Sequence, residues 1–306
     1  MLSSKNATFL FNRQFMDYHQ DRYDDHSYVV FKADKIFALF PANKSGNNLI
    51  SHQGLSYGGF LLQKDAKFED ILSAFQELLK QINADGFSEV TVKVIPKIYN
   101  CLPSDELDYL LFKLNATLMR RDVSSVIETS NSLIVSSSNR KRGLKRAKNN
   151  SLEVRESTDF ESFWNLILIP NLKSQHNAKP VHSVQEIELL HKNFPQNIRQ
   201  FNVYSKNKIV AGVTIFESEN VAHVQYISAN EKKQELGSLD ILFDYLISSV
   251  YKQKKYFDFG ISNENNGQQV NLGLLSWKES FGARSIVHDF YSIDPKEYHK
   301  LNTTLK

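Results

Sequence analysis

The sequence predicts a mixed α/β protein with α+β mixed sheets, in which helices and strands alternate. Amphipathic stretches such as residues 65–85 place apolar side chains at the three-and-four spacing of a helix. Apolar runs such as VTVKVIP and YFDFGI between them are typical of strands. The same order of elements recurs on each side of a basic stretch, so we expect domains at residues 1–135 and 151–306, joined by 136–150.

The first half is predicted to begin with a helix over residues 11–26, followed by a hairpin of strands 28–31 and 36–40. Residues 52–59 then interrupt a strand with three glycines, which indicates a plain turn or a close approach of the backbone to a ligand. On the ligand hypothesis, His52, Tyr57 and Gly58 bind substrate. Further elements are predicted at 65–85 (helix), 90–96 (strand), 105–115 (helix) and 119–129 (strand).

The second half repeats this order. We expect a strand at 152–157, helices at 159–176 and 184–193, and a hairpin of 201–204 and 209–216. A strand at 221–229, a long helix at 239–255 and a strand at 256–261 follow. The chain then closes with a helix at 271–281 and a strand at 285–293.

Composition limits the classes of function. With 41% hydrophobic and 23% charged residues the chain should fold, and a net charge of +3 does not by itself indicate nucleic acid. Cys101 is the single cysteine, the first residues lack a signal pattern, and no apolar run reaches the ~18 residues of a membrane helix. We therefore expect a cytoplasmic protein without a membrane span. Zinc-ligand spacing, GxxxxGK and GxSxG are absent from the sequence, so nothing supports a metal site, a kinase or a hydrolase.

Residues 136–150 hold six basic side chains and no acid. Such a cluster can bind an anionic ligand, and we expect Arg140, Arg142 and Lys145 to do so. A solvated helix or linker is the alternative. Nucleic acid is less favoured because no aromatic residues interleave the basic ones.

A loop before the long helix offers a second anion site. Gln234, Leu236, Gly237 and Ser238 lie where the helix should begin, and the positive end of a helix dipole binds phosphate. An ordinary helix cap is the alternative.

Catalytic candidates lie on the two flanking strands. Strict alternation puts His223 and Gln225 on one face of their strand and Tyr226 on the other, and either face could line a substrate slot. His223 is a candidate general base, with a structural histidine as the alternative. Asp258 is surrounded by aromatic residues, so it needs a partner or borders a cleft, and we favour the cleft.

Two later side chains complete the candidate substrate contacts. Asn263 follows the second strand in a polar loop. Lys278 is able to meet a carboxylate or phosphate of the acceptor, or to lie on the surface.

Several runs resemble known proteins. AGVTIF, HVQYISAN, QELGSLDILFDYLI, YFDFGIS and GLLSWKESFGAR are similar to the second domain of FemAB-like and related double GNAT (N-acetyltransferase) proteins. RYDDHSYVVFKADKIFALFPA and SHQGLSYGGF resemble their first domain, and RKRGLKRAKNN resembles the stretch that joins the two. This resemblance implies two tandem GNAT-like domains with a cleft between them, walled by residues 52–59 and the Asp258 strand. It also implies transfer of an acyl or aminoacyl group onto an amine.

The resemblance leaves the donor open between two kinds. Acetyl-CoA-binding members usually have Arg or Gln, two residues, Gly, one residue, then Gly or Ala, whereas this chain has Leu239 at the last position. We expect acetyl-CoA or another acyl-CoA as donor and an anionic acceptor, such as an amino sugar or a cell-envelope precursor. An aminoacyl-tRNA donor, as in FemAB proteins, and a non-catalytic double-GNAT binding protein are the alternatives. No heptads indicate the coiled-coil arm that FemAB members often carry.

Overall fold

The computed structural model describes residues 3–131, 133 and 137–305. Its internal contacts divide the chain into two compact units. Unit 1 comprises Met1–Val123, Asn263–Gln269 and Val287–Lys306, and unit 2 comprises Ser124–Ser262 and Val270–Ile286. Strands β8 (Thr117–Glu128) and β16 (Arg284–Ile293) each run from one unit into the other. The domain limits at residues 135 and 151 stay a prediction, since these units divide the chain at other positions.

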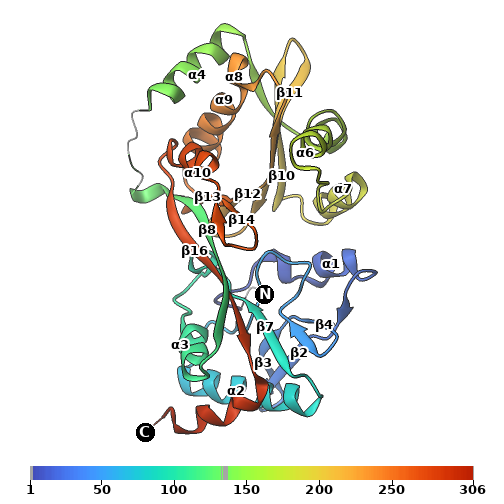
Figure 1. Cartoon of the computed structure of the whole chain (residues 1–306), viewed down its shortest axis with the longest axis vertical. Helices are drawn as coiled ribbons and strands as arrows, with labels where there is room; N and C mark the ends of the chain where they lie inside the picture. Colours follow the sequence, from blue (N-terminus) through green and yellow to red (C-terminus); the bar gives the residue numbers. More distant parts are fainter. Residues whose placement is uncertain (1–2, 132, 134–136, 306) are drawn as a thin grey trace. The chain divides into compact units, whose positions relative to one another are not determined.

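Unit 1 packs two sheets with helices. Strands β1, β4, β5, β7, β16 and β8 follow one another in one sheet, and β2, β3 and β6 form another. The main helix α2 buries Ile71, Phe75 and Leu79, and the C-terminal η7 packs on it (Figure 1). Its elements are η1 Phe9–Phe11, α1 Arg13–Met16, η2 Asp17–His19, β1 Asp24–Asp25, β2 Tyr28–Lys32, β3 Lys35–Phe40, β4 Asn43–Ser45, β5 Asn48–Ile50, β6 Leu61–Leu62, α2 Phe68–Ala84, β7 Glu89–Lys93, η3 Lys97–Tyr99, α3 Glu106–Lys113 and η7 Pro295–Thr303.

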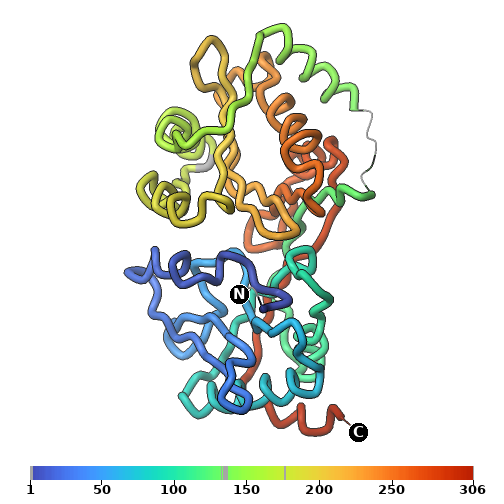
Figure 2. Tube along the Cα trace, turned by 180° about the vertical axis from the view of Figure 1, so that it is seen from behind, coloured from blue at the N-terminus to red at the C-terminus, as the bar shows by residue number. Residues whose placement is uncertain are grey.

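Unit 2 is a sheet between two helical layers. Strands β13, β12, β11, β10 and β9 follow β8 in the sheet order. Helices α4, α8, α9 and α10 cover one face, and α5, η5, α6 and α7 lie on the other (Figure 2). The elements are η4 Thr129–Asn131, α4 Ser138–Asn149, β9 Glu153–Ser157, α5 Phe160–Phe163, η5 Trp164–Leu168, α6 Ile169–His176, α7 Val184–Asn193, β10 Ile198–Ser205, β11 Lys208–Glu217, β12 Val221–Ala229, α8 Lys233–Leu236, α9 Ser238–Tyr245, η6 Leu246–Val250, β13 Tyr256–Ile261 and α10 Leu272–Glu279. A short ladder of β14 Asn263–Glu264 and β15 Gln269–Val270 precedes α10.

The two apolar cores explain why the predicted elements form. The α9 face of unit 2 buries Leu242, Phe243 and Leu246 against Phe257 and other strand residues, which confirms the three-and-four pattern of this helix. Both predicted hairpins are confirmed as β2–β3 and β10–β11. The predicted helix over residues 11–26 is wrong in extent, because a short α-helix, a 3-10 turn and strand β1 replace it.

None of the helices in the described ranges combines the length and the hydropathy that crossing a membrane requires.

Candidate functional site

Strands β12 and β13 of unit 2 separate shortly after they begin. Their parallel pairing covers Val221↔Tyr256, Ala222↔Phe257 and His223↔Asp258. Beyond that point β12 shifts register against β11, where Thr214 faces Tyr226 and Ile215 faces Val224, so Gln225 is the extra residue of a β-bulge. A bulge bends its strand and increases the local twist. The last paired residues, His223 and Asp258, therefore lie where the two strands part.

A second irregularity lies opposite, in β13. Its register against β8 shifts between Asp258 and Ile261, and Gly260 has φ +76°. A Cβ added at Gly260 would lie 3.4 Å from Cε1 of His223, so this backbone passes close to the imidazole. Glycine suits the position because a residue with a Cβ has a higher conformational energy at this positive φ.

His223 and Asp258 form a hydrogen-bonded pair. Nδ1 of His223 lies 2.9 Å from Oδ2 of Asp258, and the imidazole side chain is 21% exposed whereas the carboxylate side chain is 5% exposed. The other carboxylate oxygen accepts hydrogen bonds from Oγ of Ser124 at 2.7 Å and from the amide of Gly260 at 2.8 Å. The carboxylate is thus buried and held from three sides, while the imidazole remains partly accessible.

Electrostatics keep this carboxylate ionised. Burial alone would raise the pKa of Asp258, but His223 and the hydrogen bonds from His223, Ser124 and Gly260 lower it to about 2. A buried anion that accepts from Nδ1 fixes the orientation of the imidazole and leaves Nε2 as the nitrogen that can accept a proton. This arrangement suits a general base.

Lys278 supports the same loop from α10. Its Nζ donates to the carbonyl oxygens of Gly260 at 2.8 Å and Ile261 at 2.7 Å, and to Oγ of Ser262 at 3.0 Å. The residue is 3% exposed, and burial lowers its pKa to about 8, while the charge of Asp258 acts in the opposite direction. The expected contact of Lys278 with the acceptor substrate is therefore corrected. All three ammonium hydrogens donate to oxygen atoms inside unit 2, so Lys278 positions the end of β13.

The bulge also corrects the predicted alternation along β12. Tyr226 lies on the same face as His223, because Val224 and Ile227 both pack in the core beneath α9. The Tyr226 ring contacts Trp164, and its hydroxyl lies 2.5 Å from Nδ1 of His182. Burial raises the pKa of Tyr226 to about 12, so the phenol stays protonated. The predicted substrate contact of Tyr226 and Gln225 stays a prediction.

The expected phosphate loop before α9 is closed by α4. Gly237 has φ +71°, and a Cβ there would lie 2.2 Å from the carbonyl oxygen of Gly143 in α4. Ser238 is 0% exposed and Leu236 is 9% exposed, while the exposed Gln234 lies in the preceding short turn.

A carboxylate adds to this closure. Asp240, in the first turn of α9, ion-pairs with Arg140 of α4 at 2.5 Å. Protein backbone and a carboxylate thus occupy the helix end and do not favour a diphosphate there, so the binding of one by Gln234, Leu236, Gly237 and Ser238 stays a prediction without support from this packing.

The basic stretch is a helix with two different faces. Arg140 faces inward, with its guanidinium 2.5 Å from Asp240 and 4.9 Å from the ring centre of Phe281. Arg142 and Lys145 are exposed, and Arg142 donates to Asn139. The prediction that all three hold one ligand is wrong for Arg140, whose charge already has an internal partner. For Arg142 and Lys145 it stays a prediction.

The candidate residues of unit 1 lie inside a packed loop. His52 is 3% exposed, and burial together with the charge of His19 lowers its pKa to about 4. Tyr57 donates its hydroxyl hydrogen to Thr8 at 3.1 Å, and a Cβ at Gly58 would lie 2.1 Å from the carbonyl oxygen of Ser51.

A lysine holds this loop from within. Nζ of Lys93 donates to the carbonyl oxygens of His52, Gln53 and Leu55, at distances of 3.1, 3.1 and 2.8 Å. His52, Tyr57 and Gly58 therefore shape the fold of unit 1, and their predicted substrate contact has no exposed surface to support it.

Asn263 also has a structural part. Its side-chain oxygen accepts from the amide of Val123 at 2.5 Å, and its Nδ2 donates to the carbonyl oxygen of Gly267 at 3.1 Å. These bonds close the short ladder before α10. In the described part of the chain, no three His, Cys, Asp or Glu side chains gather to hold a metal ion.

Comparison with known proteins identifies the fold. No family model and no curated protein matches the sequence. The chain is similar in structure to FemX, at TM-score 0.68 and 8% identity over 98% of this chain and 95% of that one. It is also similar to a C-terminal DUF2156 domain assigned to a lysylphosphatidylglycerol synthetase of Agrobacterium fabrum, at TM-score 0.59 and 10% identity over 95% of each chain. L-PGS from Bacillus licheniformis aligns at TM-score 0.58 and 15% identity, over 92% of this chain and 87% of that one.

The chain therefore has a FemAB-like fold of mixed α/β type, as the sequence resemblance implied. At these identities the likeness establishes the fold alone, so the chemistry has to be argued from the residues of this chain.

Proposed function

We propose that the protein is an N-acyltransferase that moves an aminoacyl or other acyl group from an activated ester to an amine. The observation that carries the proposal is the His223–Asp258 pair, placed where β12 and β13 separate. Transfer to an amine needs a group that accepts the amine proton and donors that stabilise the oxyanion. The parted strands place a candidate base beside strand edges that no longer pair with each other.

The proton transfer follows from the hydrogen bond to Asp258. Because the buried carboxylate accepts from Nδ1 of His223, the tautomer assigned to the imidazole has Nε2 without a proton. Nε2 takes a proton from the attacking amine, and Asp258 stabilises the imidazolium that forms. Beyond this pair β12 and β13 no longer pair with each other, and in this proposal backbone N–H groups on the edge of β12 stabilise the carbonyl oxygen of the donor, since the amide of Gly260 on β13 already donates to Asp258. Collapse of the tetrahedral intermediate then breaks the ester bond, and the leaving oxygen takes the proton from Nε2 of His223.

We propose an aminoacyl-tRNA as the donor. The α9 end, where an acyl-CoA diphosphate was expected, is covered by α4 and carries the Asp240 carboxylate. The outward face of α4 exposes Lys141, Arg142, Lys145 and Lys148, which suits the phosphates of a polynucleotide. The FemAB resemblance of the sequence implies the same class of donor, and the FemX-like fold supports it. An acyl-CoA donor would have to bind its diphosphate at another surface.

The acceptor belongs to the same proposal. It is the free amine of an anionic molecule, such as an amino sugar or a cell-envelope precursor, and the reaction takes place in the cytoplasm, where charged tRNA is found.

Parallel donor assays test the proposal. The full chain is incubated with a panel of amines, including amino-sugar nucleotides and lysine-containing peptides. One arm contains tRNA charged with labelled amino acids, and label that moves to an amine product is counted. The other arm contains acetyl-CoA, and thiol release is followed. We expect label transfer without thiol release. Thiol release without label transfer would show that the donor is acyl-CoA. If the protein gives no label transfer and no thiol release, the catalytic proposal is contradicted.

A further inference from the structure

Unit 1 contains a cavity that the proposed reaction does not use. It has a volume of about 430 Å³ and lies at the C-terminal end of α3, beside β16. The residues that line it are Asp108, Leu111, Phe112, Asn115, Ala116 and Tyr291. The volume falls within the range of about 300–1,000 Å³ that small-molecule sites occupy.

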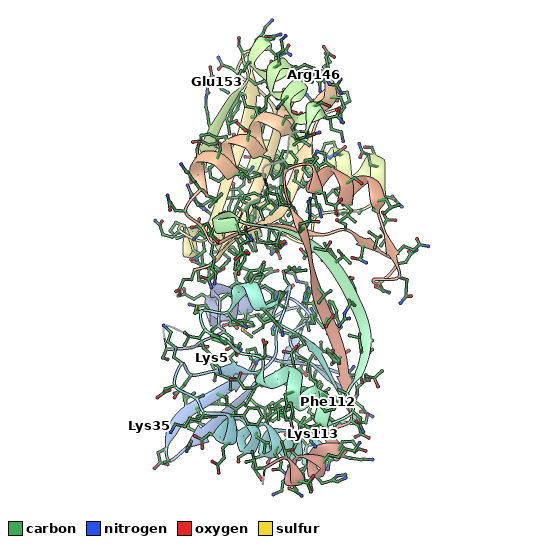
Figure 3. All side chains as sticks on the ribbon, turned by 90° about the vertical axis from the view of Figure 1, so that its left-hand side faces the viewer. Lys5, Lys35, Phe112, Lys113, Arg146 and Glu153 are labelled. Carbon is green, nitrogen blue, oxygen red and sulfur yellow. The ribbon has the colours of Figure 1, made fainter. Side chains whose placement is uncertain are left out.

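Exposed aromatic rings continue from this cavity along α3. Phe112 is 73% exposed and Tyr109 is 43% exposed, and their ring centres lie 6.3 Å apart. The ring of Phe68 lies a further 5.6 Å from that of Tyr109. Figure 3 shows Phe112 at the surface of α3, next to Lys113 in the sequence. A row of exposed aromatic rings is unusual on a protein surface and marks a site of interaction.

The charges around the cavity favour a cation. Asp108 places a carboxylate in the lining, with its side chain 45% exposed. Lys97 lies 3.7 Å from Asp108 but 2.8 Å from Asp105, which is its nearer partner. On the β16 side, Asp289 accepts two hydrogen bonds from Arg121, at 2.6 and 2.7 Å.

Among the described residues, Asp108 is the one charged residue of the lining, because Lys97, Asp105, Arg121 and Asp289 lie outside it. Burial raises the pKa of Asp108, which Lys97 partly offsets. The C-terminal end of α3 adds partial negative charge from its carbonyl groups. Lys113, in the last turn of α3, opposes this partial charge, but like the other cations it lies outside the lining.

We propose that this cavity binds an organic cation, a methylated or primary ammonium group, with its charge beside Asp108 and its carbon atoms against Phe112 and Tyr291. A carboxylate and aromatic faces attract such a cation together, and the attraction is stronger where water is excluded. The site is separate from the proposed active centre, because all of its residues belong to unit 1 and those of the active centre belong to unit 2.

A matched pair of ligands tests the site. Choline and 3,3-dimethylbutan-1-ol have the same shape, but only choline is charged. Each is titrated into the full chain by isothermal calorimetry at constant ionic strength. We expect saturable binding of choline, with the neutral analogue weaker by about tenfold, which corresponds to about 1.4 kcal/mol. Equal binding of the two ligands, or no saturable binding of choline, would overturn the proposal.

Three variants locate the binding. Asp108→Asn and Phe112→Leu change exposed side chains of the lining and should each weaken choline binding about fivefold or more. Asp105→Asn is the control, because this carboxylate pairs with the same Lys97 but does not line the cavity. If Asp105→Asn weakens binding as much as Asp108→Asn, the cation responds to the general field of the surface and the cavity is not its site.

Discussion

Replacing Gly237 with alanine tests the contact through which α4 closes the end of α9. The residue has φ +71°, and the new Cβ would lie 2.2 Å from the carbonyl oxygen of Gly143. Two costs follow: the left-handed conformation costs about 1–2 kcal/mol in a residue with a Cβ, and forcing the backbones apart costs about 1–3 kcal/mol. Gly46→Ala is the control, because Gly46 has φ +60° and its Cβ would meet nothing within 4 Å. Gly237→Ala should therefore lower the free energy of unfolding by about 1–3 kcal/mol more than Gly46→Ala.

Urea unfolding measures this difference. Circular dichroism follows the whole chain, while fluorescence follows unit 2, which contains both tryptophans, Trp164 and Trp277. Equal losses of stability in the two variants would refute the reasoning. In that case α4 would not rest on the start of α9, and the helix end would again be available for a diphosphate.

Three further predictions concern unit 2. Asp258→Asn removes a carboxylate whose folded pKa of about 2 lies below its ordinary value of 3.8. As the pH falls from about 5 to about 2, the wild type should therefore lose about 2 kcal/mol more of its free energy of unfolding than the variant does. Urea titrations at several pH values measure this difference. Arg140→Ala should lower the free energy of unfolding by about 3 kcal/mol, because it leaves the buried Asp240 carboxylate without its ion-pair partner. Arg142→Ala, at an exposed position, should change it by less than about 0.5 kcal/mol. Similar losses in the two variants would contradict the description of α4 as a helix with one buried and one exposed face. Lys278→Met leaves buried carbonyl oxygens without a donor and should lower the urea midpoint by an amount equivalent to about 2–4 kcal/mol, and an unchanged midpoint would count against its positioning role.

The regular elements could be predicted because their patterns are local. Helix α2 follows from apolar residues at helical spacing, and it ends where expected, before Gly86 with φ +89°. Strict alternation failed at Gln225 because a single extra residue moves every later side chain to the other face. The sequence alone does not reveal a bulge, because a bulge is defined by how the strand pairs with its neighbour.

The inner face of α4 was missed, although the sequence held a signal for it. Gly143 and Ala147 are the small residues of the basic run, four positions apart, and both are buried against the α8–α9 segment. Small residues at helical spacing permit close approach of a second backbone, which an exposed linker does not need.

Of the candidate site, His223 and Asp258 could be predicted as chemical groups, but their pairing could not. It depends on the parallel register of β12 and β13, which brings together residues 35 positions apart in the chain. Ser124 was also missed, because a serine on a strand carries no mark of the carboxylate that it meets across the sheet.

The most direct test of the central claim, that His223 is the general base, is the single-turnover rate of amine aminoacylation from charged tRNA by His223→Gln and by a matched histidine variant. His299→Gln serves as the control, since His299 is exposed in unit 1. We predict that His223→Gln remains folded and loses about 10²–10⁴ in rate, whereas His299→Gln keeps the wild-type rate. A folded His223→Gln variant that transfers at the wild-type rate would contradict the account.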